Sequence, residues 1–67
     1  METNIASERV RSGMTQKEVG DFLDVSMQTV SRIETGKAMP GGAVLCKLAD
    51  RFGCSVDYLL RRTEDRR

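Results

Sequence analysis

The sequence predicts an all-α protein, a compact five-helix bundle in which the second and third helices form a helix-turn-helix. Two observations lead to this fold class. Apolar residues recur at the helical spacing i, i+3, i+4 along most of the chain, and no strand is expected. Residues 15–37, TQKEVGDFLDVSMQTVSRIETGK, contain two amphipathic segments joined by a connection too short to let them separate. Two helices held this close cross at a steep angle, as in a helix-turn-helix.

The first helix is expected over residues 3–12 and is ended by Gly13. Three apolar residues define its expected inward face: Ile5, Ala6 and Val10. Arg9 projects from the same side, and because a buried guanidinium keeps its charge, it requires a carboxylate partner. Glu34 is the best candidate, so we predict an Arg9–Glu34 ion pair that fixes the third helix on the body of the protein. The alternative is that Arg9 reaches solvent along its alkyl stem.

The second helix is expected over residues 16–23. It begins with Thr15 and Glu18, which form the S/T-x-x-E capping box that satisfies free backbone donors at a helix start. Its apolar residues recur with a helical period: Val19, Phe22 and Leu23. The pattern is then broken by Asp24-Val25-Ser26, which predicts the turn between the two helices.

The third helix is expected over residues 27–35, with Ser26 as its N-cap and Gly36 at its left-handed end. Its inward residues are Val30 and Ile33. The opposite side is a polar strip flanked by Met27: Gln28, Ser31, Arg32 and Thr35. This strip contains no carboxylate, although the chain has 10 Asp and Glu residues. Because amide and guanidinium groups bind base edges, a face that reads a DNA groove is favoured over a plain polar surface.

The longest predicted loop covers residues 36–42, where one proline and three glycines occur. The fourth helix is expected over residues 43–52, with a continuous apolar stripe: Val44, Leu45, Leu48, Ala49 and Phe52. Gly53 ends this helix, and Ser55 caps the last one. The core is then closed by three residues: Val56, Leu59 and Leu60.

Length and composition limit the classes of function. We expect one domain, residues 1–67, with its core at about 5–60, and we expect the Arg-rich residues 61–67 to be a frayed, solvated tail. The N-terminus is polar, and no apolar run approaches the roughly 20 residues that cross a bilayer. A cytoplasmic protein is therefore expected.

The cysteines and charges add further limits. Two cysteines and no histidine exclude a zinc finger, which needs four Cys/His ligands. Cys46 and Cys54 are expected to be small hydrophobic residues at helix positions rather than a disulfide or redox pair. The net charge of +1 says little about nucleic acid, because a local basic patch decides phosphate binding. Such a patch is predicted from three residues and could include Arg11: Lys17, Arg32 and Lys37.

A set of residues in a fixed order and spacing runs through most of the chain: Thr15-Gln16, Val19, Leu23, Val25-Ser26, Val30-Ser31, Ile33-Glu34, Gly36-Lys37, Pro40, Leu45, Leu48-Ala49 and Ser55-Val56-Asp57-Tyr58-Leu59-Leu60. No single residue is diagnostic, but the order and spacing together are highly specific. With this set the chain resembles the Cro/cI-type, lambda-repressor-like (XRE) family of helix-turn-helix DNA-binding domains over about residues 5–60.

This resemblance implies roles for individual residues. Base edges in the major groove would be met by Met27, Gln28 and Arg32, and Ser31 is either a further contact or a solvated spacer. Phosphates would be contacted by Gln16, Lys17, Thr29 and Lys37. Two of these residues have a structural alternative, since Thr29 could only pack between helices and Met27 could only flank the core. The family's buried Arg–Glu pair falls on Arg9 and Glu34, as the helical face also indicates.

Two positions depart from the family pattern. Gly20 replaces the usual alanine where the second helix crosses the third, which permits a close approach but weakens a helix interior by up to about 1 kcal/mol. Asp24 replaces the usual left-handed glycine of the turn. Aspartate tolerates that conformation better than most residues, so we expect the turn to persist with some strain.

The expected function is that of a sequence-specific DNA-binding transcriptional regulator. We expect a repressor that binds double-stranded DNA as a homodimer on a pseudo-palindromic operator. The alternatives are an antitoxin-type autorepressor and a protein-binding module that keeps the fold. No enzyme activity, cofactor, metal, membrane or small-molecule ligand is expected, since the chain has no histidine and no glycine loop for phosphate.

Overall fold

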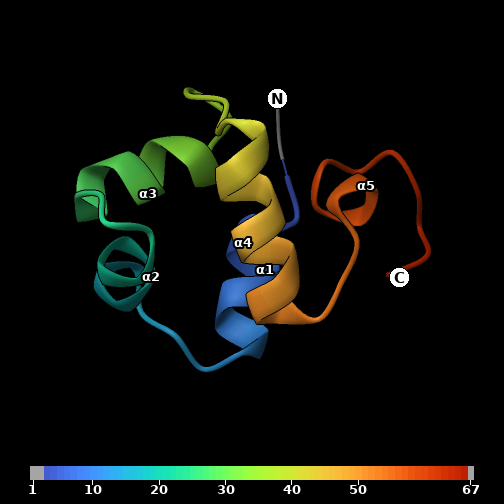
Figure 1. The fold of residues 1–67 in the computed structure, drawn as a ribbon, viewed down its shortest axis with the longest axis horizontal. Coiled ribbons are helices and arrows are strands. Elements are labelled where there is room, and N and C mark those ends of the chain that lie inside the picture. Colours follow the sequence, from blue (N-terminus) through green and yellow to red (C-terminus); the bar gives the residue numbers. More distant parts are fainter. Residues whose placement is uncertain (1–2, 67) are drawn as a thin grey trace.

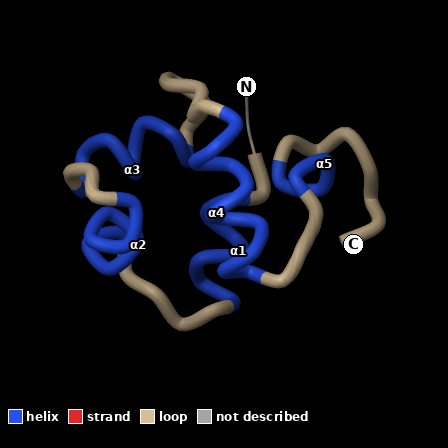
Figure 2. The backbone as a smooth tube through the Cα atoms, in the orientation of Figure 1, coloured by secondary structure: helices blue, strands red, loops and turns tan. Residues whose placement is uncertain are grey.

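The computed structural model of the chain describes residues 3–66. Within this range it is all-helical, with five α-helices and no strand, as predicted (Figures 1 and 2). The helices are α1 (Ile5–Arg11), α2 (Gln16–Leu23), α3 (Met27–Glu34), α4 (Gly42–Phe52) and α5 (Val56–Leu59). The bounds of α1 to α4 lie within two residues of those expected from the sequence, and α5 begins directly after its predicted cap, Ser55.

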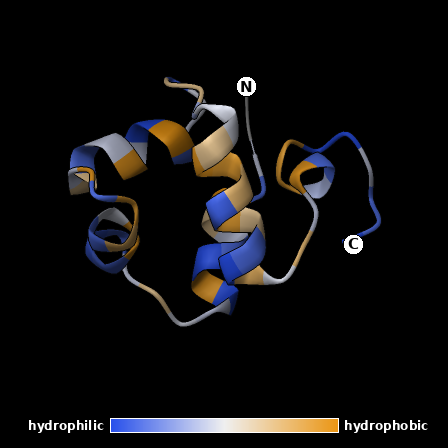
Figure 3. Cartoon of the chain, in the orientation of Figure 1, coloured by the Kyte–Doolittle hydropathy of each residue, from blue (hydrophilic) through white to orange (hydrophobic). Residues whose placement is uncertain are grey.

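One hydrophobic core joins the five helices. Its most deeply buried side chains come from every helix: Ile5, Val19, Val30, Leu48 and Leu59. Figure 3 shows that hydrophobic and hydrophilic residues are interleaved along α2 and α3, and the buried ones are hydrophobic side chains such as Val30 and Ile33. On α3, Gln28 and Arg32 are exposed, so this side of the helix is not covered by the other described residues.

Side-chain caps start three of the helices where the sequence predicts them. At α2, Thr15 Oγ1 accepts from the Glu18 backbone N–H at 3.0 Å, and Glu18 Oε1 accepts from the Thr15 N–H at 2.9 Å, which completes the capping box. Ser26 and Ser55 cap α3 and α5 by accepting from a backbone N–H three residues later, at 3.1 Å in both cases. These bonds fix where α2, α3 and α5 begin.

The turn between α2 and α3 depends on two unusual backbone positions. Asp24 adopts the predicted left-handed conformation, with φ 59° and ψ 44°. Gly20 brings α2 against the next segment, since a Cβ added there would lie 2.7 Å from the Val25 carbonyl oxygen. The Val25 N–H also donates to the Gly20 carbonyl at 2.9 Å. Glycine is therefore required by the close approach of α2 to the start of α3 in this structure.

The inward face of α1 differs from the prediction. Val10 was expected to face the core, but 65% of its surface is exposed, whereas Glu8 is only 2% exposed. Relative to Ile5, the buried side follows the spacing i, i+3, i+4 and so includes Glu8 and Arg9. Phe22 on α2 is also 42% exposed despite its helical spacing from Val19. Val10 lies outside the stripe that α1 turns to the core, whereas on α2 the buried stripe is narrower than the spacing suggests and holds Val19 and Leu23.

The C-terminal segment is not the frayed tail that the sequence suggested. The Arg66 guanidinium contacts the buried Glu8 carboxylate, with Nη2 2.7 Å from Oε1, and it also donates to the carbonyls of Phe52 and Gly53 at the end of α4. The Arg66 carbonyl accepts from the Ser55 N–H at 2.8 Å. A buried carboxylate needs a counter-ion, and for Glu8 this is the Arg66 guanidinium at the end of the C-terminal segment. Residue 67 lies outside the described residues.

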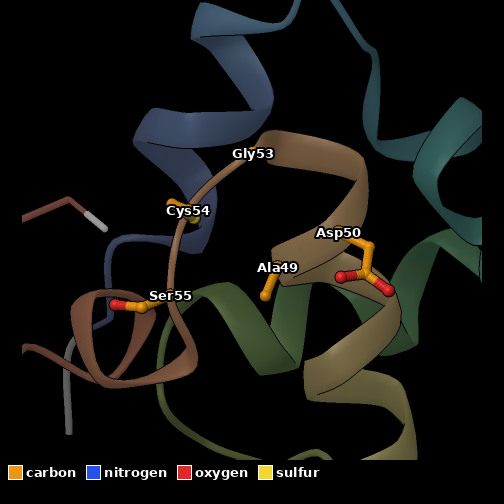
Figure 4. A pocket seen from close by; sticks show the side chains of 5 residues that line it. All are labelled: Ala49, Asp50, Gly53, Cys54 and Ser55. Atoms are coloured by element: carbon orange, nitrogen blue, oxygen red, sulfur yellow. The ribbon is translucent and has the colours of Figure 1, made fainter.

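The cysteines also differ from the prediction. Both are free thiols, as expected, but Cys46 is exposed on α4 and Cys54 lies in the connection to α5 rather than in a helix. Only Cys54 packs against the core. Burial, together with the Glu8 carboxylate, raises the pKa of the Cys54 thiol. Cys54 and Asp50 help to line a surface pocket between the last turns of α4 and the connection to α5 (Figure 4).

Candidate nucleic-acid interface

The core packing of α3 decides which of its residues can meet a ligand. Val30 is 1% exposed and Ile33 is 6% exposed, so this side of α3 lies against the other helices. The cap at Ser26 fixes the first turn of α3. Since the side chains of a helix spread around its axis, the residues opposite Val30 and Ile33 must face solvent.

The outer face of α3 carries the residues predicted to read bases. Gln28 and Arg32 are exposed, and neither side chain forms a hydrogen bond or an ion pair within residues 3–66. They lie four residues apart, so their side chains project from the same side about one turn, or roughly 6 Å, apart. Met27, at the start of the helix, is 49% exposed. These three side chains are therefore free to contact a partner.

Two other predicted contacts are less accessible. Thr29 is half-buried, and its hydroxyl lies 3.0 Å from the Ser26 hydroxyl. Ser31 is also half-buried. Thr35, the last residue of the predicted polar strip, donates its hydroxyl to the Ser31 carbonyl at 3.1 Å. Thr29 and Thr35 thus hydrogen-bond within α3 and its cap.

The two lysines predicted to contact phosphates differ in whether their ammonium groups form an ion pair. Lys37 is exposed, and its ammonium has no partner within the described residues. Lys17 forms an ion pair with Asp21 at 3.1 Å, but the two side chains are 74% and 70% exposed. A pair this exposed is worth only about 0.3–0.5 kcal/mol, so Lys17 can exchange Asp21 for another anion at little cost.

The predicted Arg9–Glu34 ion pair is present. Arg9 Nε lies 2.6 Å from Glu34 Oε2, and the two side chains are 17% and 6% exposed. Arg9 Nη1 also donates to the Met14 carbonyl at 2.9 Å. The pair therefore joins α1 to α3 behind the outer face. The alternative, in which Arg9 reaches solvent without a partner, is wrong.

Gln16 has a contact that the sequence did not indicate. Its amide nitrogen donates to the second oxygen of the Glu34 carboxylate at 2.9 Å. Gln16 also lines a surface pocket between the end of α1 and the starts of α2 and α3, together with Lys17 and Met27. The structure thus brings together three predicted site residues that are up to eleven positions apart in the sequence.

Two other features were sought in the described part of the chain, a metal-binding cluster and a membrane span. Residues 3–66 hold no group of three or more His, Cys, Asp or Glu side chains arranged to bind a metal ion. No helix in that range is both long enough and apolar enough to span a bilayer.

The crossing of α2 and α3 and the exposed outer face of α3 define a helix-turn-helix protein. The chain belongs to the family described as Helix-turn-helix, whose model matches residues 5–59, and this agrees with the Cro/cI-type resemblance. It is 38% identical over 55 residues to the SPbeta prophage-derived uncharacterized HTH-type transcriptional regulator YonR of Bacillus subtilis. It is 35% identical over 57 residues to the competence pilus inhibition repressor of Acinetobacter baylyi.

These matches cover most of this chain but only part of the relatives. They take in 82% and 85% of this chain and 51% and 52% of the respective relatives, so the chain spans about half their length. Among solved structures, the P22 c2 repressor in complex with a synthetic operator matches with a TM-score of 0.78 and 30% identity. That match covers 88% of this chain and 89% of the other. The relatives reported are described as regulators and repressors.

Proposed function

We propose that the chain is the DNA-binding domain of a transcriptional repressor and that α3 lies in the major groove. The observation that carries this proposal is the outer face of α3, where Gln28 and Arg32 are exposed, lack a side-chain partner among residues 3–66 and have no neighbouring carboxylate on that face. A helix about 10–12 Å in diameter fits a major groove about 12 Å wide. The resemblance to a repressor solved with its operator supports the same assignment.

Two side chains would discriminate between bases. The Gln28 amide suits the paired donor and acceptor of adenine, and the Arg32 guanidinium suits the two acceptors of guanine. Their separation along α3 corresponds to roughly two base-pair steps of about 3.4 Å. Met27 would add an apolar contact at the edge of the face, suited to a thymine methyl group. Ser31, half-buried, would be a minor contact.

The remaining site residues would position the domain on the DNA backbone. Lys37 and Lys17 would bind phosphates as point charges, with Lys17 giving up its exposed contact to Asp21. Gln16 would contact a phosphate at the start of α2. Thr29 would do so only if the Ser26 hydroxyl is the donor of their hydrogen bond, which leaves the Thr29 O–H for a phosphate, and we therefore rank it last.

A single domain of this size buries only about 600–1,000 Å² on DNA, which is little for selective binding. We therefore propose that the protein acts as a homodimer on a pseudo-palindromic operator, in the cytoplasm of a bacterium or its phage. Analytical ultracentrifugation with and without the selected duplex would test the stoichiometry of two chains per site. One chain per site would contradict the dimer but leave α3 as the reading helix.

Selection of bound sequences from a random duplex pool tests base reading. The expected result is a short motif, and Arg32→Ala should relax the preference at one position of each half-site, at a cost of about 1–3 kcal/mol. The matched control is Arg51→Ala, which removes an exposed arginine from α4 and should leave the motif unchanged. If Arg32→Ala weakened binding equally on specific and random duplexes, Arg32 would be a phosphate contact instead.

A further inference from the structure

The Glu34 carboxylate on α3 accepts hydrogen bonds from two other helices. One carboxylate oxygen accepts from Arg9 Nε of α1 at 2.6 Å, and the other accepts from Gln16 Nε2 of α2 at 2.9 Å. The Glu34 side chain is only 6% exposed, so both bonds lie largely out of water. Helices α1, α2 and α3 therefore meet at the Glu34 carboxylate.

The chemistry of this contact fixes how the Gln16 amide is turned. A carboxylate only accepts hydrogen bonds, so the nitrogen of the Gln16 amide, and not its oxygen, must face Glu34. A primary amide has a second N–H, and the Gln16 side chain forms no other hydrogen bond within residues 3–66. A phosphate oxygen is also an acceptor only, and so needs this kind of donor.

We propose that Glu34 is a positioning residue for DNA binding, because it holds the Gln16 amide in the orientation that leaves one N–H for a backbone phosphate. This inference rests on the proposed function. Without Glu34 the amide would rotate freely and could present its oxygen, which repels a phosphate. Fixing one such side chain before binding is worth about 3- to 10-fold in Kd.

Arg9 makes this arrangement compatible with DNA. An unpaired carboxylate next to a phosphate would oppose binding, but the charge of Glu34 is compensated by the guanidinium 2.6 Å away. The Arg9–Glu34 ion pair also attaches the inward side of α3 to α1. The Glu34 carboxylate therefore links the placement of the reading helix to the orientation of a donor on α2.

A double-mutant cycle on DNA affinity tests the proposal. Glu34→Gln keeps the shape of the side chain and one oxygen, which can still accept from Arg9. The second carboxylate oxygen, which accepts from the Gln16 amide nitrogen in the wild type, is replaced by an NH₂ group that cannot accept. On a random-sequence duplex at low salt, Gln16→Ala should raise Kd by about 3- to 10-fold in the wild-type background and by less than about 2-fold in the Glu34→Gln background. Gln28→Ala is the matched control, and its effect should be equal in both backgrounds.

The side-chain amide of Gln16 gives a second measurement that needs no variant. In the free wild-type protein, ¹⁵N relaxation should show this amide as rigid and that of the exposed Gln28 as mobile. Glu34→Gln should mobilise the Gln16 amide. Equal mobility of the two amides in the wild type would overturn the proposal even if Glu34→Gln did not fold.

The outcomes separate this inference from the proposed function. If the wild type binds DNA but Gln16→Ala has the same effect in both backgrounds, Glu34 does not position Gln16. If Gln16→Ala has no effect in either background, Gln16 is not a phosphate contact and the inference fails. If the wild type shows no salt-dependent DNA binding, both the function and the inference are wrong.

Discussion

Replacement of Arg9 by methionine should destabilise the protein more than any change at a surface charge. It leaves the Glu34 carboxylate, 6% exposed, with only the Gln16 amide as partner. Breaking a buried pair from one side costs about 3–5 kcal/mol, and we expect about 2–4 kcal/mol here because the Arg9 side chain is still 17% exposed. A domain of 67 residues has a total stability of only about 3–10 kcal/mol, so this loss is a large fraction of it.

Urea unfolding followed by circular dichroism measures the effect. Arg9→Met and Glu34→Met should each lower the free energy of unfolding, whereas the double variant should lose at least about 1.5 kcal/mol less than the sum of the two. In the double variant no charge is left without a partner, and two methionines fill the space. Thermal midpoints should fall by more than about 10 °C for each single variant.

The exposed Lys17–Asp21 pair is the internal control. Its side chains are 74% and 70% exposed, so Lys17→Met should change stability by no more than about 0.5 kcal/mol. Additive losses of less than about 1 kcal/mol at Arg9 and Glu34 would refute the reasoning, because they would mean that the pair behaves like a surface contact.

Three further predictions concern other parts of the fold. Asp24→Gly should raise the melting temperature by a few degrees, because glycine adopts φ 59° without strain. Arg66→Met should lower the melting temperature by leaving the buried Glu8 with only the longer, 4.0 Å contact to the exposed Arg11, whereas Arg62→Met, whose ion-pair contact is exposed and 3.9 Å long, should have little effect. Iodoacetamide should alkylate Cys46 faster than Cys54 at neutral pH, since burial raises the pKa of the Cys54 thiol and so lowers its thiolate fraction.

Each of these has a contradicting result. An unchanged or lower melting temperature for Asp24→Gly would argue against a strained left-handed turn. Equal effects of the Arg66 and Arg62 variants would mean that the C-terminal segment does not neutralise Glu8. Alkylation of Cys54 at the rate of Cys46 would mean that its thiol is open to solvent. Folding raises the pKa of the Cys54 thiol from 9.0, so at high pH the thiol ionises more readily in the unfolded chain. The contribution of Cys54 should therefore lower the free energy of unfolding only as the pH rises above about 9.0.

Local signals were sufficient to predict the helices and their starts. The capping box at Thr15 and the caps at Ser26 and Ser55 act within three residues, so the sequence pattern contains the whole interaction. The left-handed Asp24 follows from the same kind of local rule. The Arg9–Glu34 pair joins residues 25 positions apart, but it could be predicted because a buried arginine restricts its partners to carboxylates on facing helices.

Contacts between distant segments were harder to predict. Glu8 and Arg66 are 58 positions apart, and their pairing depends on how the chain after α5 returns to α1. The burial of Glu8 could have been predicted from the sequence, because Glu8 follows the buried Ile5 by three residues and so lies on the same side of α1. Val10 follows Ile5 by five residues and lies outside this side. The hydrogen bond from Gln16 to Glu34 had no such signal, since a glutamine side chain at a helix start has many acceptable orientations.

The central claim is that the outer face of α3 binds double-stranded DNA. The most direct test is a titration of the ¹⁵N-labelled protein with duplex DNA in dilute salt, followed by NMR. The account predicts that the signals of Gln28 and Arg32 shift most, and that the shifts vanish as the salt concentration rises, because phosphate contacts release counterions. Signals on α3 that stay unchanged for specific and random duplexes alike would contradict it.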